Sequence, residues 1–135
     1  MIGLVVVTHG ALAIELRKAT EHVVGPMAQM QTVCIGADDD LEKAAQEIRE
    51  AVAQAGSGTG VLLLTDMFGG TPSNLSIALL KDGEVEVIAG VNLPMLIKLS
   101  QARKKETLDE AAQTAKAAGR RYIAIASEII AGDES

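Results

Sequence analysis

Short aliphatic runs that alternate with amphipathic segments constrain the fold of this chain more than any other feature. Residues 4–7 and 61–64 are unbroken aliphatic stretches, and each leads within a few residues into polar and turn residues. Such runs are typical of parallel strands that are buried on both faces. Because aromatic residues make up 1% of the chain and hydrophobic residues 48%, we expect a core of Ala, Val, Ile, Leu and Met.

The apolar spacing predicts an alternation of strands and helices along the chain. Strands are predicted at residues 2–7, 30–35, 60–64, 85–89 and 122–126. Helices are predicted at residues 12–24, 41–55, 73–80, 90–102 and 107–119. Alternation of this kind implies right-handed crossovers. We therefore predict an α/β fold with a doubly wound, mostly parallel sheet, whose first four strands take the order 2-1-3-4.

The length of the chain bounds its organisation. Its 135 residues suffice for one domain with a real core, which we place at residues 1–130, followed by a flexible tail at 131–135. The longest apolar runs fall far short of the roughly 18 residues that a membrane span needs, so we expect a soluble protein. The first residues lack the basic head and the small-residue cleavage site of a secretory signal, which makes the cytoplasm the expected compartment.

The net charge of the chain limits the classes of partner that it can bind. A net charge of −6 opposes binding to nucleic acid and to anionic lipid, and the short basic runs at 103–105 and 120–121 are too few to offset it. The same negative field favours encounter with a basic protein. Cys34 is the only cysteine, which excludes an intrachain disulfide or a thiolate metal site. We expect it to be a buried strand thiol.

Three consecutive aspartates, Asp38, Asp39 and Asp40, allow two interpretations. They could ligate a metal ion, or they could cap the helix that begins near Leu41 and stabilise the positive end of its dipole. The second interpretation explains them without further ligands. We therefore predict neither a metal site nor a bound cofactor.

The candidate chemistry lies where two strands of the predicted sheet end. Ligands of an open α/β sheet bind beyond the carboxyl ends of the strands, where the strand order reverses. With strands one and three as neighbours, His9 and Asp66 face that crevice. The imidazole can carry a phosphoryl group or shuttle protons, and a carboxylate beside it would fix its tautomer and stabilise a cationic ring. Gly69, Gly70 and Thr71 would offer backbone N–H groups and a hydroxyl to a phosphoryl anion.

Each of these residues also has a purely structural interpretation. His9 could cap the following helix, Asp66 could brace its loop, and Gly69 and Gly70 could form a tight turn. Their convergence on the ligand-binding edge of the sheet favours the functional interpretation. His22, by contrast, lies in the middle of a predicted helix beside Glu21 and reads as a surface residue.

Three segments of the chain carry a family resemblance. They are Val-Thr-His-Gly at residues 7–10, Asp-Met-Phe-Gly-Gly-Thr-Pro-Ser-Asn at 66–74, and Gly-Val-Asn-Leu-Pro-Met-Leu at 90–96. Together they closely resemble the mannose-type IIA component of the bacterial phosphoenolpyruvate:sugar phosphotransferase system. The likeness covers about the whole chain with its spacing preserved, and the second and third segments are specific in combination.

The resemblance implies a phosphohistidine carrier. His9 would receive a phosphoryl group from the phosphocarrier protein HPr and pass it to a IIB component, expected on a separate polypeptide. Asp66 would be the hydrogen-bond partner of that histidine, and Thr71 would help to hold the phosphoryl oxygens. Members of this family are homodimers with four parallel strands and a final antiparallel strand exchanged between subunits, for which residues 122–126 are placed. Contact with a membrane would be indirect, through a permease complex.

Two departures from the family pattern concern the surface that meets a partner. Some members have Trp in place of Phe68, and Ser73 stands where a larger apolar residue is often found. The sugar is therefore left open, and the sequence does not specify the IIB component or the phosphorylated ring nitrogen of His9 either.

Other functions are compatible with an α/β fold of this kind. A signalling receiver domain would need an acidic pair after the first strand to hold Mg²⁺, and this chain has Thr-His-Gly there. A hydrolase would need a serine in an elbow between glycines, which is absent. The phosphotransfer subunit of a dihydroxyacetone kinase shares the expected fold, and a regulatory carrier that moves no sugar would share the site. These last two are the alternatives to sugar transport.

Overall fold

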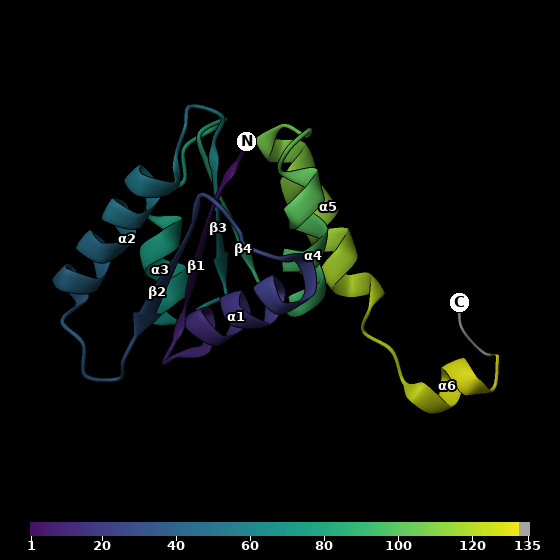
Figure 1. Cartoon of the computed structure of the whole chain (residues 1–135). Coiled ribbons are helices and arrows are strands. Elements are labelled where there is room, and N and C mark those ends of the chain that lie inside the picture. The colour runs from purple at the N-terminus through teal and green to yellow at the C-terminus, as the bar shows by residue number, and fades with distance from the viewer. Residues whose placement is uncertain (133–135) are drawn as a thin grey trace.

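Four parallel strands form the centre of the protein, whose computed structural model describes residues 1–132 (Figure 1). They are β1 (Gly3–His9), β2 (Met30–Ile35), β3 (Val61–Thr65) and β4 (Val85–Ala89). Their order across the sheet is β2-β1-β3-β4, and every neighbouring pair is parallel. The α/β fold and the strand order predicted from the sequence are confirmed.

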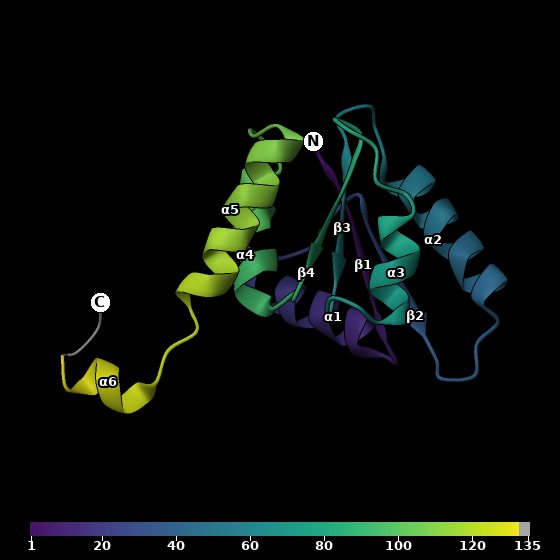
Figure 2. The same ribbon diagram turned by 180° about the vertical axis from the view of Figure 1, so that it is seen from behind.

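Helices cover the sheet in two layers, one on each face (Figures 1 and 2). One layer contains α1 (Leu12–Val24), α4 (Leu93–Ala102) and α5 (Leu108–Arg121), and the other contains α2 (Leu41–Ala55) and α3 (Thr71–Ile77). None of the helices in residues 1–132 has the length and apolarity that a bilayer crossing would need.

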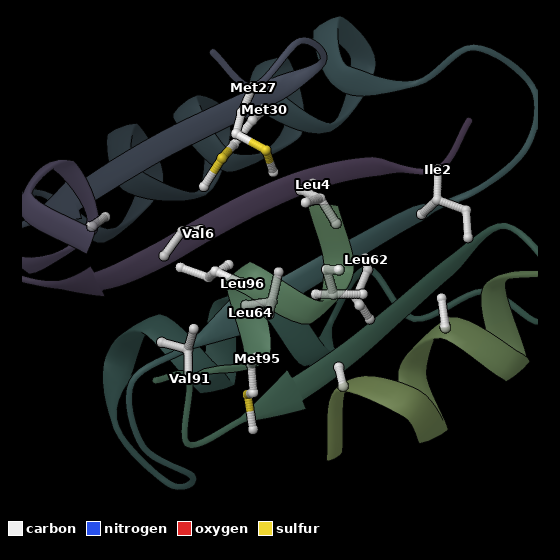
Figure 3. Packing of buried hydrophobic residues seen from close by; sticks show 14 of the residues in the cluster. Ile2, Leu4, Val6, Met27, Met30, Leu62, Leu64, Val91, Met95 and Leu96 are labelled. Carbon is white, nitrogen blue, oxygen red and sulfur yellow. The ribbon is translucent and has the colours of Figure 1, made fainter. Parts of the chain in front are cut away.

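The core is aliphatic on both faces of the sheet because successive strand residues point to opposite sides. Leu4 and Val6 of β1 pack with Leu62 and Leu64 of β3 beneath the α1, α4 and α5 layer, joined by Met95 (Figure 3). The residues between them pack on the α2 and α3 side. With only one Phe and one Tyr in the chain, both exposed, the aliphatic core expected from composition is confirmed.

Side-chain caps define where several helices begin. The Asp40 carboxylate accepts the N–H of Glu42 at 3.0 Å, so this aspartate caps α2. Thr107 and Glu110 form the reciprocal capping box predicted at the start of α5. That helix continues two residues past Gly119, to Arg121, because Gly119 is buried within it and does not end it.

Residues 122–126 do not form the predicted fifth strand in this single chain. Tyr122 ends α5, residues 123–125 have no sheet partner, and α6 (Ala126–Ile130) follows. All residues from 121 to 132 are exposed, and Figures 1 and 2 show the segment projecting from the body. A strand needs a neighbour for its backbone hydrogen bonds, and the chain itself does not fold back to provide one.

Two further predictions, for Cys34 and for the C-terminal tail, can be compared with the structure. Cys34 lies on β2 as predicted but is only partly buried, beside the core under α1. Of the predicted tail at 131–135, Ala131 and Gly132 form a turn after α6, and residues 133–135 lie outside the described residues.

A buried arginine ties together the end of the sheet opposite the strand C-termini. Arg103 is the largest fully buried side chain, 2% exposed, and forms no ion pair with a described residue. Its Nε donates to the carbonyl of Ile2 and its Nη2 to that of Gln29, each at 2.9 Å. Gln29 has a φ of 50°, which is unfavourable for a non-glycine residue. Burial lowers the pKa of this guanidinium, whose charge the carbonyl oxygens stabilise.

Replacing Arg103 with Met should destabilise the protein by about 2–4 kcal/mol, because the buried carbonyls of Ile2 and Gln29 would lose charged donors. The measurement is urea unfolding. Lys104→Met is the matched control at an exposed neighbouring position and should change the free energy of unfolding by less than about 0.5 kcal/mol. Equal stability of the two variants would show that the guanidinium is dispensable.

Candidate functional site

His9 and Asp66 meet at the carboxyl edge of the sheet. His9 is the last residue of β1, and Asp66 directly follows β3, which pairs with β1 so that Val7 lies opposite Thr65. One carboxylate oxygen, Oδ2 of Asp66, accepts both the backbone N–H of His9 at 3.0 Å and a hydrogen bond from its ring Nδ1 at 2.8 Å. The sequence-based expectation that these two residues face each other is confirmed.

Both oxygens of the Asp66 carboxylate accept hydrogen bonds. Its other oxygen, Oδ1, accepts the backbone N–H of Met67 at 3.1 Å. Burial alone would raise the pKa of Asp66, but the hydrogen bonds from the backbone and ring of His9, and the charge of the ring when it is protonated, outweigh burial, so the pKa lies below its ordinary value. Asp66 is therefore ionised at neutral pH, and its partner Nδ1 must carry a hydrogen.

The second ring nitrogen of His9 is left free on the open side of the site. With Nδ1 donating to Asp66, the neutral ring presents a lone pair at Nε2, which forms no hydrogen bond with the described residues. The His9 side chain is 50% exposed, whereas that of Asp66 is 14% exposed. The geometry thus offers a nucleophilic nitrogen to solvent and keeps the orienting carboxylate behind it.

Gly70 sets the position of the imidazole through its lack of a side chain. A Cβ at this residue would lie 2.8 Å from Cε1 of His9, closer than Cβ atoms approach other atoms, and 3.1 Å from Nε2, so the imidazole would have to shift. The φ of Gly70 is −89°, which any residue can adopt, so the requirement for glycine here is steric.

The loop after Asp66 is fastened to α3 by a hydroxyl that sequence reasoning had not assigned a role. Gly69, at a φ of 96°, directs its N–H to Oγ of Ser73 at 3.4 Å. Ser73 is fully buried in the first turn of α3. The N–H of Gly69 is thus turned toward Ser73, and Thr71, at the start of the helix, lines the open hollow.

A second hydroxyl braces the other side of the site. Oγ1 of Thr8, fully buried, accepts the N–H of Ala13 at 2.7 Å in the first turn of α1. This bond holds the turn that carries His9 against that helix. Thr8 lies three residues before Ala11, the N-cap of α1, so the preference of Thr for the N-cap position does not predict this bond.

A hollow of about 380 Å³ opens in front of the imidazole. His9, Thr71, Asp39 and Leu41 are among the residues that line it. Within residues 1–132 no three His, Cys, Asp or Glu side chains are grouped to hold a metal ion. His22 is exposed on α1 and takes no part in this hollow.

Comparison with protein families and curated proteins gives a consistent result. The family model described as "PTS system fructose IIA component" (EIIA-man) matches residues 3–116. The mannose-specific EIIAB component of the PTS system from Escherichia coli K12 is 33% identical over 121 residues, 88% of this chain. The chain covers only 38% of that protein's length. The fructose-specific EIIA component from Bacillus subtilis is 26% identical, with 95% of this chain and 88% of that protein covered.

Solved structures show the same fold. The EIIA component from Streptococcus agalactiae superimposes with a TM-score of 0.85 at 25% identity, covering 94% of this chain and 98% of the other. The mannose/sorbose-specific IIA subunit from Enterococcus faecalis gives 0.82 at 28% identity, covering 92% and 93%.

Replacing Gly70 with Ala should destabilise the protein by about 1–3 kcal/mol, because the new methyl group would collide with the His9 ring. In a His9→Ala background this cost should disappear, and urea unfolding of the four proteins measures the coupling. Gly69→Ala is the matched control. It meets no neighbouring atom within 4 Å, so its backbone strain should be the same with or without His9. A Gly70 cost that is independent of His9 would contradict the steric assignment.

Proposed function

The chain belongs to the EIIA-man family of IIA components of the phosphotransferase system, and we propose that it carries a phosphoryl group on His9. In this proposal the donor is phosphorylated HPr and the acceptor is a IIB component. The hydrogen bond that fixes Nδ1 of His9 on Asp66 is the observation that carries the proposal, because it leaves Nε2 free to attack phosphorus.

The transfer is written as an in-line displacement. The lone pair of Nε2 forms a bond to phosphorus while the bond between phosphorus and the donor atom of HPr breaks, and that donor atom keeps the electron pair. The proton on Nδ1 of His9 stays in place, so the phosphorylated ring is cationic and the carboxylate of Asp66 stabilises it. In the second transfer a nucleophile of the IIB component attacks the same phosphorus, and His9 leaves as the neutral tautomer.

The phosphoryl oxygens are proposed to lie against the loop before α3. The N–H groups at the start of a helix lack partners within it, and Thr71 adds a hydroxyl on the wall of the hollow that holds His9. Gly70 allows the close approach of loop and imidazole, and Gly69 supplies the left-handed turn. Because the Gly69 N–H is directed to Ser73, we assign the main anion contacts to Gly70 and Thr71.

The surface around His9 suits a protein partner. Leu41 on the wall of the hollow is 58% exposed, and Met67 in the loop after Asp66 is 57% exposed. Asp39 on the wall of the hollow and the net charge of −6 favour a partner with basic residues beside its phosphorylated group. We propose that both transfers take place in the cytoplasm, between proteins that dock here in turn.

We also propose that the protein is a homodimer in which the C-terminal segment of each chain is exchanged with the other, as the family resemblance implies. The exposure of Ile123, Ile125 and Ile130, at 76%, 61% and 86%, supports this proposal. Side chains of this kind are buried in most folded proteins.

Incubation with phosphoenolpyruvate, enzyme I and HPr should add one phosphoryl group to the protein, stable to alkali and labile to acid. His9→Ala should abolish the addition, whereas His22→Ala, at an exposed histidine outside the hollow, should leave it unchanged. Intact-protein mass spectrometry measures both. Phosphate retained by the His9 variant would refute the assignment.

Asp66→Asn should slow phosphoryl uptake from phosphorylated HPr at saturating donor, because the amide can donate to Nδ1 and removes the charge that stabilises the ring. Loss of an orienting carboxylate costs up to about 10⁴-fold in a protease triad, and a transfer between two docked proteins should lose less. Rapid-quench kinetics gives the rate, and a thermal melt checks folding. A folded variant that transfers at the parent rate would limit Asp66 to bracing its loop.

A further inference from the structure

One backbone donor in the loop beside the imidazole is bound to a buried side chain. It is the N–H of Gly69, whose acceptor is Oγ of Ser73 at 3.4 Å. This distance lies beyond the usual range for N–H···O hydrogen bonds, so the bond is weak. Gly69 itself is exposed, whereas Ser73 is completely buried. A weak bond thus turns a donor of an exposed loop toward the interior of the protein.

The burial of Ser73 corrects one expectation from the sequence. Its departure from the family pattern was expected to alter the surface that meets a partner, but no part of this side chain is exposed. Ser73 is the third residue of α3, and its hydroxyl reaches back to the loop that precedes the helix. An apolar side chain at this position would offer that loop no acceptor. The consequence of having serine here therefore concerns the loop and its N–H groups.

The loop that carries this donor lies against the ring nitrogen that would receive phosphorus. A Cβ at Gly70 would lie 3.1 Å from Nε2 of His9, and Gly69 directly precedes Gly70. Consecutive Cα atoms are only about 3.8 Å apart. Neither glycine has a side chain that restricts rotation of the peptide groups on either side of it. The N–H of Gly69 therefore belongs to a short, adaptable stretch of backbone next to the proposed phosphorylation site.

We propose that Ser73 competes with the phosphoryl group for the N–H of Gly69 and thereby weakens the hold of the site on that group. The inference rests on the proposed function and deepens it, because it concerns how readily the carrier gives the phosphoryl group up. A charged phosphoryl oxygen accepts a stronger hydrogen bond than a serine hydroxyl does. When the N–H of Gly69 turns to that oxygen, the bond to Ser73 is lost, which offsets part of the gain.

A weakened hold suits a carrier that takes part in two successive transfers. The phosphoryl group must first move onto His9 and then leave it for the IIB component. A phosphohistidine that is bound too tightly would slow the second transfer. Ser73 touches neither the phosphoryl group nor the reacting atoms in this proposal. It is a positioning residue, which acts through the direction of one backbone N–H.

The first test measures the equilibrium of phosphoryl transfer. Phosphorylated HPr is mixed with the unphosphorylated protein in the absence of enzyme I, and intact-protein mass spectrometry gives the phosphorylated fraction of each partner at equilibrium. Ser73→Ala removes the competing acceptor, so it should shift the equilibrium constant toward the phosphorylated carrier. The expected shift is about two- to tenfold, which corresponds to the net contribution of one hydrogen bond. An unchanged constant, or a shift toward phosphorylated HPr, would overturn the proposal.

Ser76→Ala is the matched control for this measurement. Ser76 is also a completely buried serine of α3, but its hydroxyl donates to the carbonyl of Pro72 at 2.7 Å, within the helix. Its removal should leave the transfer equilibrium unchanged. A shift as large as that of Ser73→Ala would trace the effect to the helix and overturn the proposal.

A second variant keeps the test independent of packing. Ser73→Cys fills the same position with a side chain of similar shape whose sulfur is a weak acceptor. It should shift the equilibrium in the same direction as Ser73→Ala. Thermal melts of all variants check that they are folded. A folded Ser73→Cys protein with the parent equilibrium constant would contradict competition for the N–H.

A spectroscopic signature follows the N–H itself. In ¹⁵N-labelled Ser73→Ala protein, the amide proton of Gly69 should move downfield when His9 is phosphorylated, because it then donates to a charged oxygen. A Gly69 signal that stays in place would overturn the proposal. Absence of phosphoryl uptake by the unmodified protein would instead refute the proposed function. Normal uptake with an unshifted Ser73→Ala equilibrium would refute the competition alone, so the two failures are distinguishable.

Discussion

The parallel pairing of β1 with β3 is the constraint on which the site depends. Every residue of β3 is buried, and so is every residue of β1 before His9. The register of the two strands places Val7 opposite Thr65. The chain therefore leaves the sheet at neighbouring points, and the next side chains, His9 and Asp66, are brought within hydrogen-bonding distance. A shift of register by one residue would also move the aliphatic side chains of β3 to the wrong faces. The pairing of β1 with β3 thus determines both the packing of the core and the geometry of the site.

Much of this could be predicted from the sequence because the signals are local and strong. The aliphatic runs of β1 and β3, the strands Met30–Ile35 and Val85–Ala89, and the capping box at Thr107 follow from residue type and spacing. The meeting of His9 with Asp66 needed one further rule, the strand order of a doubly wound sheet. That rule depends only on the order of the strands and not on side-chain detail, so the sequence was enough to predict that these two residues meet.

The parts that could not be predicted depend on contacts between distant residues. The bond from Gly69 to Ser73 and that from Arg103 to Gln29 need three-dimensional coordinates, since no spacing rule specifies them. The prediction of a strand at residues 122–126 differs from the structure for another reason. Their composition favours a strand, but a strand exists only beside a neighbour, and residues 1–132 offer this segment none. Propensity alone therefore predicted a strand that these residues do not form here, and α6 (Ala126–Ile130) follows instead.

The exposure of the site fits the proposed role of a phosphoryl carrier. An enzyme that completes a reaction can close over its substrate, whereas a carrier must present one phosphorus atom to two proteins in turn. Orientation therefore has to come from behind the imidazole. Here Asp66, at 14% exposure, holds Nδ1 from the β3 side, and His9, at 50%, keeps Nε2 in the open hollow. Such a site has few contacts of its own to stiffen it. The loop from Met67 to Gly70 borders this site, and Phe68 within it also lines a groove between β4 and α5.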